Sequence, residues 1–162
     1  MLAVIRRTAM LAICATVIFG SAAFAAGSDS QSVAVTKANA GFYSALTVMF
    51  TGDAAPMTKV WSHADDVTYM GPTGEFLVGW KQVSAEWQAE AEHKLGGTVE
   101  PNGTRMTVGH DLAVVSTVEK GSNVVNGKPQ NVSIRATNTF RKEAGAWKMI
   151  GHHTDLLPYL QK

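Results

Sequence analysis

The residues best suited to chemistry are two adjacent histidines near the C-terminus, His152 and His153, followed by Asp155. A neutral imidazole is an acid or base near pH 7, and a carboxylate can hold it in one orientation. Neighbouring residues on a strand point to opposite faces, so a regular strand allows only one of the two histidines to face a ligand. Alternation places His152 on the face of Ile150 and His153 on the face of Met149. A purely structural histidine pair at a sheet end is the alternative.

Asn138 is the second candidate, because it lies on an otherwise apolar strand face that runs from Val132 to Phe140. A buried amide needs hydrogen-bond partners, which a ligand carbonyl or a neighbouring strand could supply. Asp65 and Asp66 form an acidic pair where a strand begins. An Asx turn is the more frequent use of such residues, so we interpret this pair as structural.

We expect no metal site and no cofactor. The other histidines, His63, His93 and His110, fall on separate predicted elements, and the only cysteine is Cys14. Lys and Arg total 14 against 13 Asp and Glu, a balance that gives no support for nucleic-acid binding. With 46% hydrophobic residues, the 162-residue chain can bury the core of about one domain.

The first 25 residues have the pattern of a secretory signal peptide. Arg6 and Arg7 precede an apolar run over 8–19, and the segment Ala23-Phe24-Ala25 fits the small-x-small cleavage rule. A membrane anchor is the alternative, but the run is shorter than the roughly 20 residues that span a bilayer. Cleavage would leave a slightly acidic, cysteine-free domain, and we expect it to be periplasmic or secreted without inserting into a membrane.

Helices are predicted in the first part of the chain. Residues 26–39 are interpreted as a flexible leader and a helix start, and 40–162 as the folded domain. Apolar residues at three- and four-residue steps predict a helix over 33–50, and a short second helix follows at 54–61. A third helix is predicted over 81–94 and carries Trp87 on its apolar side.

Strands follow the helices. Apolar and polar residues alternate along short segments between turn residues, which predicts strands over 67–70, 75–79, 98–108, 112–120, 131–142 and 147–154. The segments 71–74 and 121–129 are rich in Gly, Pro and Asn and are interpreted as turns. Three helices followed by an antiparallel meander predict an α+β domain.

Five short motifs are spread over residues 40–160. They are Gly52-Asp53, Trp61-x-x-x-Asp65-Asp66-Val67-Thr68, Gly71-Pro72-x-Gly74, Val78-Gly79-Trp80-Lys81 and Phe140-Arg141-Lys142-x-x-Gly145-x-Trp147-Lys148. In order and spacing they resemble the cone-shaped fold of nuclear transport factor 2, whose superfamily includes ketosteroid isomerase and the SnoaL-like polyketide cyclases. The resemblance implies three N-terminal helices packed on a strongly curved, mixed and mostly antiparallel sheet, with an apolar pocket at the wide end.

The catalytic residues of ketosteroid isomerase do not all carry over. That enzyme uses an Asp as general base, and a Tyr and a protonated Asp as an oxyanion hole. By the resemblance, the base position falls on Gly71, the Tyr position on Ala45, and the protonated Asp position on or close to Asn138. Two of the three roles are vacant, so we do not expect this isomerase mechanism.

The resemblance implies a pocket for a small apolar or amphipathic ligand. Its expected ligand-binding residues are Tyr69, Trp87, Asn138, Ile150 and His152. Any acid–base activity, of isomerase, cyclase or lyase type, would use His152, Asp155 and Asn138 as catalytic residues.

Two alternatives stay open beside this hypothesis. Trp87 and Tyr69 could be ordinary core residues that leave no cavity. The domain could instead be a non-catalytic module that forms a homodimer or binds a partner protein through its open sheet face. The interface would then contain Arg135, Thr137, Thr139 and Arg141.

Overall fold

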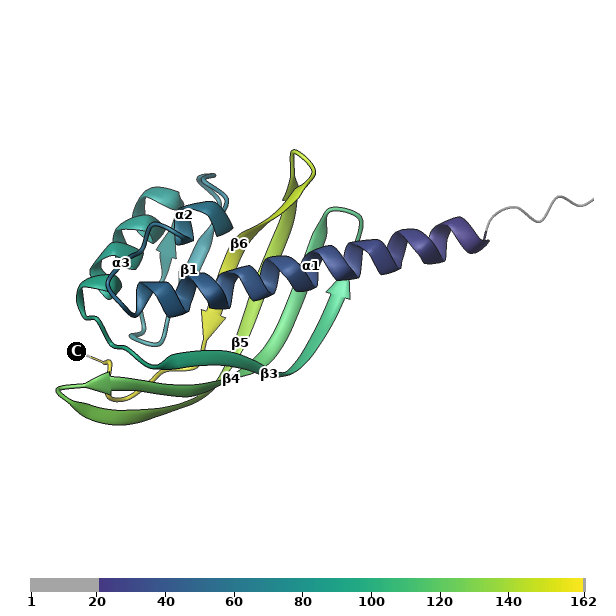
Figure 1. Cartoon of the computed structure of the whole chain (residues 1–162). Helices are drawn as coiled ribbons and strands as arrows, with labels where there is room; N and C mark the ends of the chain where they lie inside the picture. The colour runs from purple at the N-terminus through teal and green to yellow at the C-terminus, as the bar shows by residue number, and fades with distance from the viewer. Residues whose placement is uncertain (1–20, 162) are drawn as a thin grey trace, which may run out of the picture.

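A long first helix lies across the concave face of a strongly curved sheet (Figure 1). The computed structural model describes residues 21–161, which form three helices and one six-stranded sheet. The helices are α1 (Ser21–Met49), α2 (Met57–Val60) and α3 (Trp80–Glu92). Within this described part of the chain, no helix is both long enough and apolar enough to cross a membrane.

Helix α1 begins earlier than expected. It starts at Ser21 and therefore includes residues 26–32, which were expected to form a flexible leader. Gln31 ties this region to the sheet, because its amide nitrogen donates to the carbonyl oxygen of His110 at 3.0 Å and its amide oxygen accepts from Lys142 at 3.1 Å. Most of the predicted signal peptide, residues 1–25, lies outside the described residues.

The sheet is mixed and mostly antiparallel, as predicted. Its strands are β1 (Thr68–Met70), β2 (Leu77–Val78), β3 (Thr98–Val108), β4 (Leu112–Val125), β5 (Lys128–Glu143) and β6 (Ala146–Thr154). Their order is β2-β1-β6-β5-β4-β3, with β1 parallel to β6 and every other neighbouring pair antiparallel. The predicted α+β fold class is confirmed.

The hairpin between β4 and β5 is longer than predicted. Residues 121–129 were interpreted as a turn, but the strands continue to Val125 and resume at Lys128, which pair with each other. Only Asn126 and Gly127 form the connection, with φ angles of 52° and 74°. An Asn-Gly pair favours this left-handed, two-residue hairpin turn. The extended strands curl beneath the C-terminal end of α1 (Figure 1).

Strand β6 contains a bulge that reverses its alternation. Phe140 pairs with Met149 and Thr139 pairs with Gly151, so Ile150 has no partner on β5. Such an extra residue shifts all later side chains to the other face. His152 therefore lies on the same inner face as Met149. The prediction that His152 shares its face with Ile150, and His153 with Met149, is wrong for this reason.

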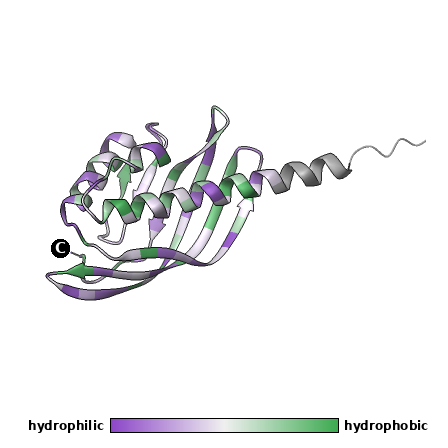
Figure 2. Cartoon of the chain, in the orientation of Figure 1, coloured by the Kyte–Doolittle hydropathy of each residue, from purple (hydrophilic) through white to green (hydrophobic). Residues whose placement is uncertain are grey.

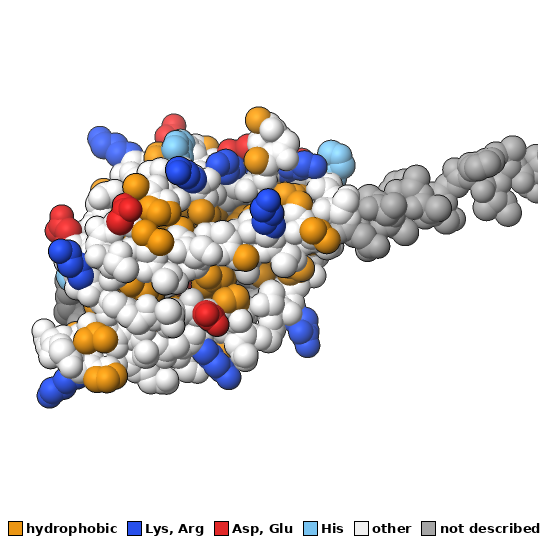
Figure 3. Space-filling view, viewed as in Figure 1, with side chains coloured by type: hydrophobic (Ala, Val, Ile, Leu, Met, Phe, Trp, Pro, Cys, Tyr) orange, Lys and Arg blue, Asp and Glu red, His pale blue; other side chains and the backbone are white. Residues whose placement is uncertain are grey.

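The core lies between the helices and the inner face of the sheet. Hydrophobic residues recur along α1 and along the strands (Figure 2). Phe42, Met49, Trp61, Val115 and Phe140 are fully buried there. On the face shown in Figure 3, charged side chains lie scattered singly, with hydrophobic atoms between them. Packing of α1 onto the concave sheet also leaves a cavity beside the core.

Candidate functional site

A cavity lies between the C-terminal part of α1, helix α3 and the inner face of the sheet. Most of its wall is apolar, with Leu46 from α1, Val132 from β5 and Leu157 from the C-terminal segment. Its polar residues are Tyr69, Glu90, Glu119, Asn123, His152 and Thr154. The centre of a water molecule can move through about 40 Å³ of the cavity, which is room for a few waters or a small slender ligand.

Glu119 brings a carboxyl group from β4 into this cavity. Its side chain is buried, and the hydroxyl of Tyr43 on α1 donates to its Oε1 at 3.0 Å. Burial disfavours the ionised form and raises the pKa of Glu119 to about 7, against the opposing effect of the Tyr43 hydrogen bond. Glu119 is therefore able to hold or release a proton near neutral pH.

His152 lies next to Glu119 and is held by Asn138. Its Nδ1 donates to the Oδ1 of Asn138 at 2.6 Å, which leaves Nε2 facing the Oε1 of Glu119 at 4.0 Å. Burial, followed by the charge of His153, lowers the pKa of His152 to about 3. His152 is therefore a neutral imidazole near pH 7 and not the proton carrier.

Asn138 lies outside the cavity lining and connects His152 to two residues of α1. Its amide nitrogen donates to the Oδ1 of Asn39 at 2.9 Å and to the hydroxyl oxygen of Tyr43 at 3.3 Å. Burial and the charge of Glu119 raise the pKa of Tyr43, so this hydroxyl remains a donor. The donors of Tyr43, Asn138 and His152 each have an acceptor, and these hydrogen bonds hold His152 and Glu119 in a defined orientation.

An aromatic frame surrounds His152. The Phe42 ring centre lies 4.9 Å from that of His152, and the Tyr69 ring stacks at 5.8 Å. Trp87 meets Tyr69 edge to face at 4.8 Å. These rings pack around His152, in agreement with burial being the largest cause of its pKa shift.

Glu90 supplies a second carboxyl to the cavity from α3. The buried hydroxyl of Tyr69 donates to its Oε1 at 2.5 Å. Burial first, and then the charges of Glu86, Glu75 and Glu119, raise the pKa of Glu90 to about 8, against the opposing effect of the Tyr69 hydrogen bond. Tyr69, also raised in pKa by burial, stays protonated.

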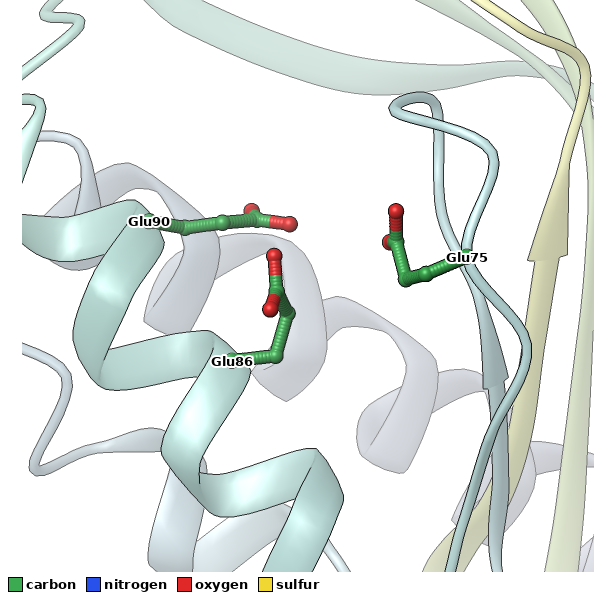
Figure 4. A group of neighbouring side chains, drawn as sticks. All are labelled: Glu75, Glu86 and Glu90. Atoms are coloured by element: carbon green, nitrogen blue, oxygen red, sulfur yellow. The ribbon is translucent and has the colours of Figure 1, made fainter. Parts of the chain in front are cut away.

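Glu75 and Glu86 lie close to Glu90, and their carboxylates point toward one another from α3 and the β1–β2 connection (Figure 4). One carboxylate oxygen from each lies within 4.8 Å of the others. Such an all-oxygen set is the kind that Mg²⁺ or Ca²⁺ accepts. The sequence analysis did not single out these three residues.

Two buried polar atoms at the cavity have no hydrogen-bond partner in the described part of the chain: the indole Nε1 of Trp87 and the Oγ1 of Thr154. Their residues are only 2% and 6% exposed. An unsatisfied buried donor or acceptor costs about 1–3 kcal/mol, a cost that a bound molecule can remove.

The structure brings together only part of the predicted site. Tyr69, Trp87 and His152 line the cavity. Asn138 lies behind His152 and outside the lining, and Ile150 is the half-buried bulge residue.

Asp155, which we expected to orient one of the two histidines, is paired with Arg135 and not with His152. Its carboxylate forms a two-pronged ion pair with the guanidinium of Arg135 at 2.8 Å. This pair lowers the pKa of Asp155 to about 2. The physical reason is the spacing, because Asp155 follows His152 by three residues and alternation therefore directs the two side chains to opposite faces.

The sequence analysis missed Tyr43, Glu90 and Glu119. Glu119 had a detectable signal, since it continues the inner face that Ala113 and Val115 begin on β4. The tyrosine of the network is Tyr43 rather than a residue at Ala45. The vacant base position at Gly71 is covered by Tyr69, whose hydroxyl would collide with any side chain there.

Comparison with known proteins agrees with this architecture. A proposed dehydratase of the nuclear transport factor 2-like family from Streptomyces avermitilis superposes with a TM-score of 0.70 at 22% identity, covering 80% of this chain and 98% of that one. A proposed calcium/calmodulin-dependent protein kinase type II association domain from Thiobacillus denitrificans gives a TM-score of 0.61 at 26% identity, covering 74% and 92%.

A plant protein and a domain family match at the level of sequence. The F-box protein SKIP8 of Arabidopsis thaliana is 27% identical over 101 residues, which are 62% of this chain but only 41% of that protein. The SnoaL-like domain family matches residues 35–157, a segment that includes every residue of the cavity described above except Leu160. The chain therefore belongs to the SnoaL-like domain family.

Proposed function

We propose that the cavity binds a small amphipathic molecule and that Glu119 exchanges a proton with it. The observation that carries this proposal is a carboxyl of pKa about 7, buried in an apolar cavity and held in place by Tyr43. A general acid or base works best when its pKa lies near the working pH. The fold similarity to a proposed dehydratase also supports acid–base chemistry.

The reaction class that fits is proton transfer next to a carbonyl. Ionised Glu119 would take a proton from the carbon beside the carbonyl, and the C–H electron pair would move toward the carbonyl oxygen. The unpaired Nε1–H of Trp87 is a donor for the negative charge that develops there. Protonated Glu119 would then return the proton to another carbon, giving an isomer, or to a departing hydroxyl group, giving water and an unsaturated product. In this proposal Glu119 replaces His152 as the proton carrier, and Asn138 and His152 are positioning residues.

Native mass spectrometry of the protein purified from its own host tests the binding proposal. We expect a co-purifying small molecule that a cavity-filling Val132→Phe variant loses. Val114→Phe is the matched control, because Val114 lies on the outer face of the same sheet. Thermal melting checks that both variants fold. Retention of the molecule by folded Val132→Phe would reject this cavity as its site.

A second candidate function is homodimerisation or partner binding through the outer face of the sheet. Leu112 and Val114 are 51% and 42% exposed on that face. Similarity to a proposed association domain supports this candidate. Arg135 and Arg141 already pair with Asp155 and Asp66, so Thr137 and Thr139 are better interface candidates than the arginines. The same mass spectra report a dimer, and Val114→Phe should weaken it while Val132→Phe should not.

We also propose that the protein is exported, on the strength of the pattern in residues 1–25. N-terminal sequencing of the protein from its host should begin at Ala26. A retained Met1 would overturn this proposal.

A further inference from the structure

The geometry points to a small amphipathic amine, bound as its ammonium ion, as the ligand class of the cavity. This inference rests on the proposed function, because it names what the same cavity would bind. It begins from the charges in the lining. Glu90 and Glu119 both line the cavity, while none of its lining residues in the described chain is Lys or Arg. The remaining ionisable lining groups are Tyr69 and His152.

Among the described residues, neither carboxyl has a Lys or Arg partner. Glu119 receives a hydrogen bond from Tyr43 and faces the Nε2 of neutral His152 at 4.0 Å. Glu90 receives one from Tyr69, and Glu75 and Glu86 add further negative charge beside it (Figure 4). A buried carboxylate is costly unless it is paired, and an ammonium group supplies the missing charge.

A second feature of the cavity also fits an ammonium group. Thr154 is a lining residue, and its buried hydroxyl oxygen has no partner in the described chain, so it can accept a hydrogen bond from N–H. Tyr69 and Trp87 are also lining residues, and aromatic rings attract cations. The apolar wall of Leu46, Val132 and Leu157 suits the hydrocarbon part of the same molecule.

Such a ligand would bind in a pH-dependent way. Near Glu119 lie Tyr43 on α1 and His152 on β6. Near Glu90 lie Tyr69 on β1, Glu86 on α3 and Glu75 on the β1–β2 connection, and the charge of Glu119 on β4 also acts on it. Glu119 and Glu90 are largely protonated at pH 5.5, and both ionise as the pH passes their pKa values of about 7 and about 8. Affinity for an ammonium ion should therefore rise from pH 5.5 to pH 8.5, while affinity for a neutral analogue should not.

The experiment compares three probes of equal chain length, n-hexylammonium, hexan-1-ol and hexanoate, by isothermal titration calorimetry at pH 5.5, 7.0 and 8.5. At pH 8.5 we expect hexylammonium to bind at least tenfold more tightly than hexan-1-ol and hexanoate to bind most weakly. Glu90→Gln and Glu119→Gln should each lower the hexylammonium affinity about tenfold and leave hexan-1-ol unchanged. Glu92→Gln is the control, because Glu92 is exposed on the same helix and outside the lining.

Each alternative outcome has a definite meaning. Hexan-1-ol binding as tightly as hexylammonium at pH 8.5, with Val132→Phe abolishing both, would overturn the amine and keep the proposed cavity function. CaCl₂ binding more tightly than hexylammonium would assign the carboxyls to a metal ion and also overturn the amine. No binding by any of the three probes would overturn both the amine and the proposed function.

Discussion

Glu119 and His152 lie 4.0 Å apart in one buried network, and burial moves their pKa values in opposite directions. Burial disfavours the charged form of each group. The pKa of Glu119 therefore rises, because its neutral form is protonated, and the pKa of His152 falls, because its neutral form is deprotonated. Asn138 keeps this arrangement by accepting from the Nδ1 of His152. Asn138 thus helps to set the polar chemistry of the cavity although it is not one of the lining residues.

The free energy of unfolding should fall as the pH rises from 6.5 to 8. Unfolded carboxyl groups lose their protons near pH 4.5, whereas folded Glu119 and Glu90 keep theirs until about pH 7 and about pH 8. Because folding raises the pKa of both carboxyls, their stabilising effect is complete below pH 4.5. It decreases as the pH rises above that value and is lost once the pH has passed the folded pKa of each group. His152 is neutral in the folded state, whereas an unfolded histidine is half protonated at pH 6.5, so His152 adds a smaller opposing slope that fades as the pH rises above about 7.

Urea denaturation at half-unit pH steps measures this effect. Each carboxyl contributes a slope of at most about 1.4 kcal/mol per pH unit. Glu90→Gln and Glu119→Gln should each flatten the slope, and Glu92→Gln should keep it. Stability that increases over this pH range would contradict the assignment.

Asn138→Ala should lower the free energy of unfolding by about 2–4 kcal/mol. Asn138 is fully buried, and its removal leaves His152, Asn39 and Tyr43 without their shared partner. Ser133→Ala on the exposed face of the same strand should change stability by less than about 0.5 kcal/mol. Equal effects of the two substitutions, measured by urea denaturation, would argue against a structural role for the network.

At the scale of elements, the sequence predicted most helices and strands but not their irregularities. Alternation along β5 correctly placed Asn138 on the inner face, because that strand is regular there. Alternation failed on β6, where Ile150 is an extra residue whose bulge depends on pairing with β5. The hydrogen bond between Tyr43 and Glu119 joins residues that are 76 positions apart in the sequence. The local sequence pattern around either residue cannot predict such a contact.

The connection between α3 and β3 offers a matched pair of glycines. Gly97 has a φ of +72°, and a Cβ there would collide with the main-chain carbonyl oxygen of Ser122. Gly96 has a φ of +59°, and a Cβ there would meet open space. Gly97→Ala should therefore destabilise the fold by about 2 kcal/mol or more, and Gly96→Ala by about 1 kcal/mol. Thermal melting of both variants measures the difference, and a larger loss for Gly96→Ala would contradict the close approach of β3 to β4.

At the scale of the whole molecule, the C-terminal segment completes the cavity. Leu157 and Leu160 line it, and the main-chain nitrogen of Leu157 donates to the carbonyl oxygen of Pro72 at 3.0 Å. The hydroxyl of Tyr159 reaches Asn123 on β4 at 3.5 Å. The segment therefore joins the β1–β2 connection to the far hairpin across the cavity, and a ligand must pass it or displace it.

Leu156→Ala and Leu157→Ala should separate the two sides of this segment. Leu157 is 6% exposed and Leu156 is 49% exposed, although they are neighbours in the chain. Leu157→Ala should cost about 2–3 kcal/mol in unfolding free energy, because it removes buried methyl groups next to an existing cavity. It should also speed the dissociation of whichever hexyl probe binds, since the wall over the cavity is thinner.

Leu156→Ala is the control, and it should leave the unfolding free energy and the dissociation rate nearly unchanged. Urea denaturation measures the first quantity and stopped-flow tryptophan fluorescence the second. A large effect of Leu156→Ala with none from Leu157→Ala would mean that the segment does not cover the cavity in solution.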